Sequence, residues 1–321
     1  MLRFHRFLLL FLSFSSFLPC NVWAMPGAVR GVRPDVSSTS VSQWRAQYVF
    51  GLPGVKPKRK GQLEVTSAEL VFNPESGKPV VVERNRILAA SASNERVELW
   101  GTAGRILRMT IPEGGGLAAA GVMHHKVGLL TVEYRDESGG YHGVVFKVAA
   151  DEVEAALQSL AEIPAASSDP QAASCDASWV KPGAVLLKAP EWQQAQVPAA
   201  YRALVYEHLA DRLQHGSART IVVRDGERTP LQGCPETTIQ IAVSHFKQGN
   251  QVQRAMSGPV GMFMGTTQME FDASITNAAG KVLRREQVKA SVRGDNESLT
   301  VADSVAKKLV KHYYRELKHT N

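Results

Sequence analysis

Residues 127–134 read Val-Gly-Leu-Leu-Thr-Val-Glu-Tyr, and residues 143–146 read Gly-Val-Val-Phe. Both runs are short and rich in β-branched side chains, and turn residues separate them, which is the pattern of a β-hairpin. From Asp151 the pattern changes, because Val153, Ala156 and Leu160 recur at helical spacing. We therefore expect an antiparallel hairpin followed by one α-helix.

Similar short runs precede this hairpin in the chain. They lie at residues 62–65, 70–72, 80–82, 87–88, 97–100 and 106–109. Short strands spaced by turn residues predict an antiparallel sheet that closes on itself. Residues 44–162 are therefore the first predicted domain, a β-barrel with a C-terminal helix.

This first region resembles the bacterial pleckstrin-homology-like (PH-like) domains. Residues 61–66, Gly-Gln-Leu-Glu-Val-Thr, and residues 69–72, Glu-Leu-Val-Phe, resemble the opening hairpin of those domains. Residues 127–134 and 143–146 resemble their last hairpin before the helix. The resemblance implies a PH-like antiparallel β-barrel, and it implies no activity because it contains no chemical motif.

A second domain is predicted at residues 183–321, after a linker at 163–182 that is rich in Pro, Ala and Ser. Pro198 suits the start of a helix that runs to Gln214, and a second helix begins near Leu299. Strand-like runs lie between the helices, at residues 221–223, 237–246, 268–275 and 282–292. This order predicts a mixed α/β domain with helices packed on one sheet, so the whole fold class is α+β.

Residues 185–317 resemble a family of uncharacterised bacterial secreted proteins and lipoproteins. The resemblance rests on helix 198–214, on Arg254 with Gly258, Gly261 and Gly265, and on the hairpin 271–283. That family is related in fold to the curli-secretion lipoprotein, the lipoprotein activator of penicillin-binding proteins and the TolB N-terminal domain. The resemblance implies a protein of the cell envelope.

The first 24 residues have the pattern of a cleavable signal peptide. Arg3 and Arg6 precede an apolar run at residues 7–18, and Val22-Trp23-Ala24 places small residues before a cleavage site. A run of about 12 residues is shorter than the roughly 20 that span a bilayer. We expect cleavage near Ala24, a flexible segment at 25–43, and a periplasmic or extracellular location.

Cysteine usage bears on both lipidation and disulfide bonding. Members of the resembled family often carry a lipidated N-terminal cysteine, but Pro19 precedes Cys20 where a lipoprotein signal needs a small residue, so we do not expect lipidation. Cys175 and Cys234 remain after cleavage. In an oxidising compartment this pair predicts a disulfide, and two free buried thiols are the alternative.

The charge of the chain favours anionic partners. The formal net charge of +7 falls to about +5 when Arg3 and Arg6 leave with the signal peptide. Outside the cytoplasm a basic protein meets anionic lipids, glycans or acidic proteins more often than nucleic acid. Lys56, Lys58, Arg59 and Lys60 form a basic run that is a candidate contact for an anionic surface.

The glycine-rich segment 249–265 is a candidate docking loop. Strand-like runs flank it and it contains no Gly-Lys-Ser/Thr, so it does not have the pattern of a phosphate-binding loop. Met262, Phe263 and Met264 form an apolar tip that, together with Arg254, is suited to a partner protein.

Motifs of catalysis are absent from the sequence. It contains no Gly-x-Ser-x-Gly and no His-Glu-x-x-His, and the adjacent His124 and His125 would point to opposite faces of a strand. We expect no enzyme activity, no metal and no cofactor. The leading hypothesis is an exported adaptor or scaffold that binds an envelope protein.

Two other hypotheses stay open at this point. One is a peripheral binder of anionic lipid or glycan surfaces. The other is a hydrolase assembled from distant residues, which would need a polar cleft with paired titratable groups. The identity of the ligand and the oligomeric state do not follow from the sequence.

Overall fold

The computed structural model describes residues 41–98, 124–161, 179–191, 197–217, 219–228, 233–249, 266–292 and 297–320. All of them belong to one compact unit, Thr39–Asn321. The predicted signal peptide, Cys20 and most of the predicted linker lie outside the described residues. Among the described helices, none is long and apolar enough to cross a membrane.

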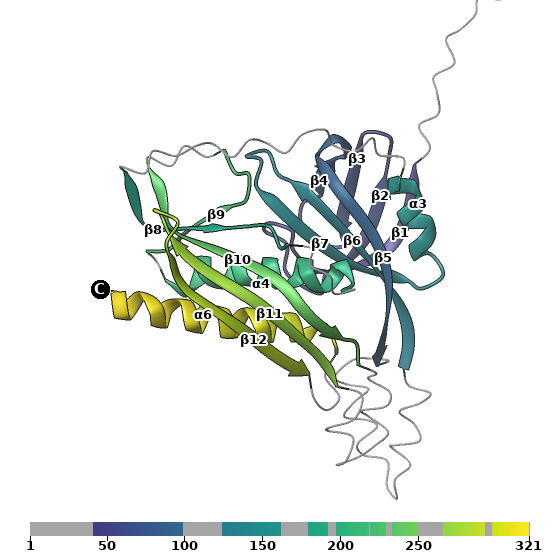
Figure 1. Ribbon diagram of the computed structural model, residues 1–321. Coiled ribbons are helices and arrows are strands. Elements are labelled where there is room, and N and C mark those ends of the chain that lie inside the picture. Colours follow the sequence, from purple (N-terminus) through teal and green to yellow (C-terminus); the bar gives the residue numbers. More distant parts are fainter. Residues whose placement is uncertain are drawn as a thin grey trace, which may run out of the picture. The chain divides into compact units, whose positions relative to one another are not determined.

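A curled antiparallel sheet of seven strands forms the first half of this unit (Figure 1). Its strand order is β4-β3-β2-β1-β7-β6-β5. The strands are β1 (Ser42–Phe50), β2 (Lys60–Val65), β3 (Glu69–Pro74), β4 (Val80–Glu83), β5 (Ile87–Glu98), β6 (His124–Arg135) and β7 (Tyr141–Ala149), with a 3₁₀ turn at Arg84–Arg86. Inside the curl, Tyr48, Phe72 and Phe146 pack together and helix α3 (Val153–Ala161) adds its apolar face.

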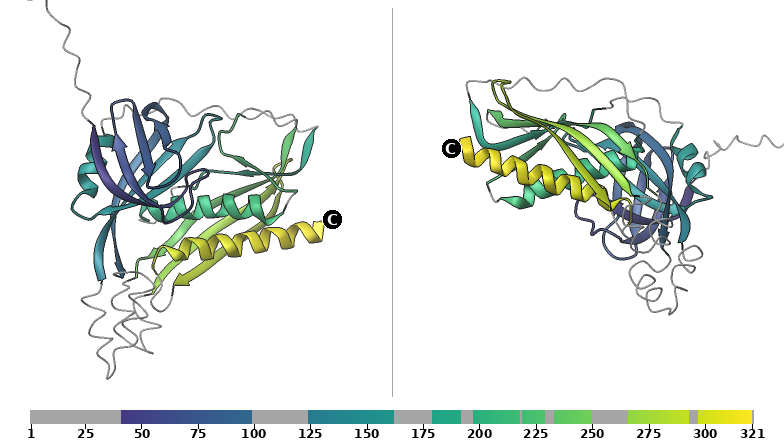
Figure 2. Two further views of the ribbon diagram at one scale, coloured as in Figure 1. Left: turned by 180° about the vertical axis from the view of Figure 1, so that it is seen from behind. Right: turned by 60° about the horizontal axis from the view of Figure 1, so that its bottom comes forward.

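A mixed sheet of five strands forms the second half, in the order β12-β11-β10-β8-β9. Its strands are β8 (Val180–Leu187), β9 (Ile221–Arg224), β10 (Cys234–Lys247), β11 (Thr267–Asn277) and β12 (Val282–Val292). β8 runs parallel to β9 and β10, whereas the β10-β11-β12 pairs are antiparallel. Two long helices, α4 (Ala199–Gly216) and α6 (Thr300–Thr320), lie side by side (Figure 2).

Helix α4 packs on strands of the seven-stranded sheet as well as on α6. Leu129 of β6 and Val145 of β7 share one buried cluster with Leu204 of α4, Phe271 of β11 and Leu309 of α6. The approach between β7 and α4 is close, since a Cβ on Gly143 would lie 2.6 Å from the Cβ of Ala203. One core therefore extends from the face of the first sheet into the second.

The predicted fold class is wrong in its architecture. The described chain is mostly β, and its seven-stranded sheet has β4 and β5 at its two ends, so it is an open, curled sheet where a closed barrel was expected. A separate α/β domain with helices packed on its own sheet is not found either. The physical reason is that α4 is surrounded by several elements, among them β7 and α6. Residues such as Ala200, Ala203 and Tyr206 of this helix are buried.

Candidate binding site

A cleft of about 410 Å³ lies where the loop after β1 faces β7, α4 and β9. One wall is the apolar loop 50–57, which contributes Phe50, Leu52 and Val55. The other wall carries His142 from β7, Glu207 from α4 and Arg224 from β9, with Asp211, Gln214 and His215 at the exposed end. Apolar walls with a few convergent polar groups are the usual form of a ligand site.

The loop wall has a defined conformation because two interactions hold it. The Leu52 N–H donates to the Tyr48 hydroxyl at 2.7 Å, and that hydroxyl is buried. Gly51 has a φ of +110°, and a Cβ there would lie 2.1 Å from the carbonyl oxygen of Gly143. Only glycine fits a position that combines a positive φ with so close a backbone.

The opposite wall is built on a buried ion pair between helix α4 and strand β9. Arg224 donates from Nη1 to Glu207 Oε1 at 2.9 Å and from Nη2 to Oε2 at 2.8 Å. The Gly143 N–H also donates to Glu207 Oε1, at 3.0 Å, and Arg224 donates to the carbonyl oxygen of Tyr141. Glu207 is only 3% exposed, so these partners replace the water that it loses on folding.

His142 lies between this ion pair and a second carboxylate. Its Nε2 is 3.1 Å from Asp136 Oδ2, and its Nδ1 is 3.6 Å from Glu207 Oε1. The ring stacks on Tyr134, with 5.2 Å between the ring centroids. Asp136 is held in turn by the Ser138 hydroxyl at 2.6 Å and by the Gly140 N–H at 2.9 Å, both of which donate to Oδ1.

These contacts shift the pKa of each group toward its charged form. Burial alone would lower the pKa of His142, but its hydrogen bond to Asp136 and the negative charge of Glu207, 3.6 Å from Nδ1, raise it overall. Burial would raise the pKa of Glu207, and the charge of Arg224 and the contact with His142 lower it instead. The pKa of Asp136 falls far below its usual range, because the hydrogen bonds from His142, Ser138 and Gly140 outweigh burial.

One polar atom of this network has no hydrogen-bond partner. His142 is 4% exposed and its Nδ1 is buried, yet no donor or acceptor lies within hydrogen-bonding distance of it. Glu207 Oε1, at 3.6 Å, is too far for a hydrogen bond and already accepts from Arg224 and Gly143. A buried polar atom of this kind at the wall of a cleft is a place for a ligand atom or a bridging water.

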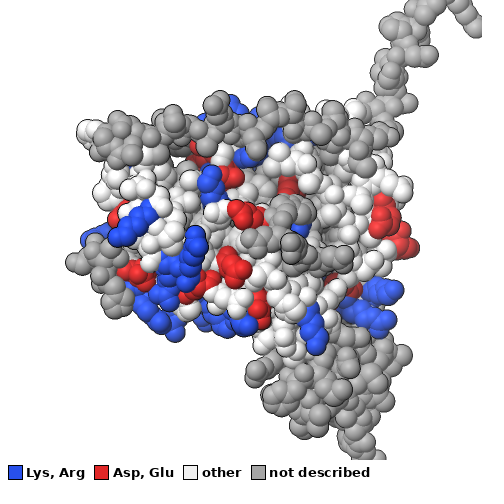
Figure 3. All heavy atoms as spheres, viewed as in Figure 1, with Lys and Arg blue, Asp and Glu red and all other residues white. Residues whose placement is uncertain are grey.

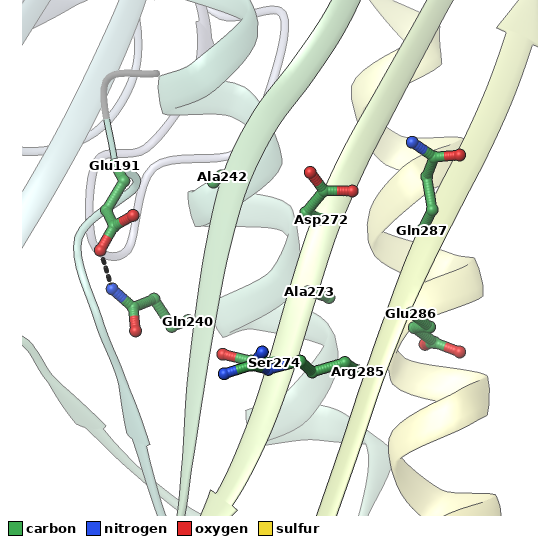
Figure 4. A pocket seen from close by; sticks show the side chains of 9 residues that line it. All are labelled: Glu191, Gln240, Ala242, Asp272, Ala273, Ser274, Arg285, Glu286 and Gln287. Carbon is green, nitrogen blue, oxygen red and sulfur yellow. Dashed lines mark hydrogen bonds between the residues drawn. The ribbon is translucent and has the colours of Figure 1, made fainter. Parts of the chain in front are cut away.

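Two larger hollows are less suited to specific binding. One, of about 540 Å³, lies on the face of the five-stranded sheet between Gln240, Asp272 and Arg285, as Figure 4 shows. The other, of about 750 Å³, lies over β1 and β2 beside Arg45 and Gln62. The polar side chains that line both are exposed or half-buried, although Oε1 of Glu286 beside the first hollow is buried without a hydrogen bond from any described residue.

The predicted contact residues lie elsewhere or outside the described chain. Arg254, Met262, Phe263 and Met264 are outside the described residues, so the docking loop stays a prediction. Lys56, Lys58, Arg59 and Lys60 are all exposed, at the start of β2 and in the turn before it. None of these four lines the cleft, although Val55 and Pro57 beside them do.

The predicted disulfide is only half inside the described chain. Cys234 is 2% exposed at the start of β10 and is disulfide-bonded. Cys175 lies outside the described residues, so its pairing with Cys234 stays a prediction. Over the described ranges, no group of three or more His, Cys, Asp or Glu is arranged to hold a metal ion.

Sequence reasoning missed the cleft residues Asp136, His142, Glu207 and Arg224. A signal for one of them was present in α4, where Ala199, Ala203 and Ala210 lie within about 40° of one another, on a different side of the helix from the apolar Leu204 and Val205. Small and apolar residues on more than one side indicate a helix that is buried on more than one side. A glutamate in such a helix requires a buried partner, and the sequence does not say which of its cations that is.

The comparisons with known proteins identify no family for this chain. No family model matches it, and no curated protein matches it. Among solved structures, it is similar to lipoprotein GNA1162 from Neisseria meningitidis, at 11% identity and a TM-score of 0.27, over 42% of this chain and 99% of that one. A similarity of this size carries no argument about fold or function, and the PH-like resemblance is not confirmed.

Proposed function

We propose that this chain is an exported, non-catalytic binding protein of the cell envelope and that the cleft beside His142 is its recognition site. The observation that carries the proposal is the lining of the cleft, in which the apolar loop 50–57 faces His142, Glu207 and Arg224. The proposal includes the signal peptide at residues 1–24, release near Ala24, and a Cys175–Cys234 disulfide.

The chemistry of the two walls supports a protein segment as the ligand. Phe50, Leu52 and Val55 offer apolar surface to a hydrocarbon side chain. Gln214 and His215, which are exposed at the end of the cleft, offer hydrogen bonds to polar groups of the same segment. The charges of Asp136, His142, Glu207 and Arg224 balance, so the site suits a neutral polar group better than a free ion.

The hydrolase alternative has one observation in its favour. Asp136 holds the imidazole of His142 at 3.1 Å beside a cleft, and a carboxylate-oriented imidazole at a cleft is the arrangement of a general base. The raised pKa of His142 argues against that role, because protonation removes the lone pair that a base needs. In addition, the described lining contains no serine, threonine or cysteine.

Photo-crosslinking of the full chain in living cells tests the binding proposal. A probe replaces Gln214, which is exposed and lines the cleft, and a control probe replaces Val81, which is 51% exposed on β4. We expect a discrete protein adduct at Gln214 and none at Val81.

A matched pair of blocking variants sharpens this test. Pro53→Trp fills the cleft from its rim, whereas Pro79→Trp adds the same bulk at an exposed position that does not line it. We expect Pro53→Trp to remove the Gln214 adduct and Pro79→Trp to leave it unchanged. An adduct that survives Pro53→Trp, or equal adducts at both probes, would contradict the proposed site.

A further inference from the structure

The positive charge of the chain is concentrated in its last two elements. Residues 281–321 contain 10 Lys and Arg and 5 Asp and Glu, while residues 25–280 contain 25 of each. Everything between the predicted signal peptide and β12 is therefore formally neutral. In Figure 3, Lys and Arg gather along the lower left of the face shown, toward the part of the molecule that holds β12 and α6 in Figure 1.

Helix α6 divides its surface between ion-paired flanks and one unpaired row. Toward β12, His312 contacts Glu286 at 2.7 Å and Arg284 contacts Glu316 at 2.9 Å. Toward α4, Asp303 accepts from Arg212. Val305, Leu309 and Tyr313 face the core. These contacts fix the rotation of the helix about its axis.

The remaining face carries Lys307, Lys311 and Arg315, which we call the basic stripe. Residues four apart lie above one another on a helix, about 6 Å apart along the axis. All three side chains are exposed, and none of them forms an ion pair with any described residue. Lys308 lies beside the stripe and donates to the backbone carbonyl of Lys289 on β12.

We propose that the basic stripe docks this protein on an anionic lipid bilayer. A straight row of unpaired cations on the outer side of a helix matches an extended negative surface. A bilayer with anionic headgroups is such a surface, and it attracts each nearby Lys or Arg by about 1 kcal/mol, a factor of about five in binding. The apolar face of α6 is buried in the core, so the contact is electrostatic and peripheral.

This assignment differs from the basic run predicted at Lys56–Lys60. That run lies in the turn before β2, and Lys60 is the first residue of β2. Within it, Arg59 Nη1 donates a hydrogen bond to the Ser76 hydroxyl at 2.6 Å. The stripe, by contrast, belongs to a 21-residue helix whose position is set by the core. The two clusters can be compared directly by neutralising three cations in each.

The test measures partition of the full mature chain onto vesicles by co-sedimentation. The vesicles are phosphatidylglycerol with phosphatidylcholine, and phosphatidylcholine alone serves as the neutral surface. The variant Lys307→Gln/Lys311→Gln/Arg315→Gln is compared with Lys56→Gln/Lys58→Gln/Lys60→Gln, which has the same net charge. We expect the first to lower partition onto anionic vesicles roughly 100-fold and the second to lower it less than about five-fold.

Three results would contradict the proposal that the basic stripe binds the bilayer. Equal partition of the unmodified chain onto neutral vesicles, or no partition onto anionic ones, would overturn the proposal. So would a loss in the Lys56/Lys58/Lys60 variant that equals the loss in the α6 variant. Pro53→Trp should bind vesicles as the unmodified chain does, which separates this proposal from the one made for the cleft.

Discussion

Replacing Arg224 with methionine removes the cation of the buried ion pair and keeps most of its volume. Glu207 is then left 3% exposed with a full negative charge. Two hydrogen bonds from Arg224, of 2.8 and 2.9 Å, disappear, and among the described residues the Gly143 N–H still donates to this carboxylate. We therefore expect a large loss of stability.

The magnitude follows from similar buried pairs. Breaking one by removing a single partner costs about 3–5 kcal/mol, because the remaining charge has no compensation. In this protein the Gly143 N–H and the nearby His142 ring compensate part of the Glu207 charge. We therefore expect Arg224→Met to lower the free energy of unfolding by about 3 kcal/mol. That is a large share of the roughly 5–15 kcal/mol by which a protein is stable. The assay is urea unfolding followed by tryptophan fluorescence, with the slope of the transition unchanged.

A second variant separates the charge from the packing. Glu207→Gln/Arg224→Met removes both charges and keeps a carbonyl oxygen that accepts from the Gly143 N–H. We expect this double variant to be more stable than Arg224→Met alone by at least about 1 kcal/mol. If Arg224→Met costs less than about 1 kcal/mol, or if the double variant is the less stable of the two, the buried ion pair does not hold α4 against β9 as described.

Three further predictions concern the same region. Gly51→Ala should destabilise the protein more than Gly54→Ala in thermal unfolding. Both positions have a positive φ, which costs a non-glycine residue about 1–2 kcal/mol, but a Cβ at Gly51 would also lie 2.1 Å from the carbonyl oxygen of Gly143, whereas a Cβ at Gly54 would meet no atom within 4 Å. Equal losses of stability would refute the close contact at Gly51. Because folding raises the pKa of His142 above its ordinary value of 6.5, its contribution to stability is fully present below that pH and is lost as the pH rises through the folded-state pKa. The difference in unfolding free energy between the unmodified chain and His142→Gln should therefore shrink as the pH rises above 6.5, and a difference that grows would contradict the assigned contacts. Tyr201→Phe removes the 2.7 Å hydrogen bond from the Tyr201 hydroxyl to the buried Glu95 carboxylate. Urea unfolding should show that the free energy of unfolding falls by about 1–3 kcal/mol. An unchanged free energy of unfolding would mean that this contact does not join α4 to β5.

The local elements of this fold follow closely from the sequence. The short apolar runs at residues 70–72 and 144–146 lie in β3 and β7, and the helical spacing after Asp151 corresponds to α3. The hairpin expected around residues 276–280 joins β11 and β12. Periodicity predicts such elements because it records which side of each element is buried, and that depends on residues close together in the chain.

The architecture did not follow, because periodicity does not say what buries a face. The run of apolar positions in α4 predicted a helix packed on one sheet, and the structure places it against β7 and α6 at once. The pattern of short strands predicted a closed barrel, and closure depends on whether β4 and β5 pair, which is a contact between distant residues. In both cases the prediction of helix or strand was right, and the prediction of what the element packs against or pairs with was wrong.

The basic stripe can be recognised without coordinates. The amino-acid sequence shows the excess of Lys and Arg after residue 280, the helical spacing of Lys307, Lys311 and Arg315, and the apolar positions that orient their helix. The candidate cleft, by contrast, exists only in the folded chain. Its ion pair joins Glu207 to Arg224 across 17 positions, and His142 lies 65 positions before its neighbour Glu207. The contacts among these groups shift their pKa values against the effect of burial, and those contacts exist only when β7, α4 and β9 have packed together.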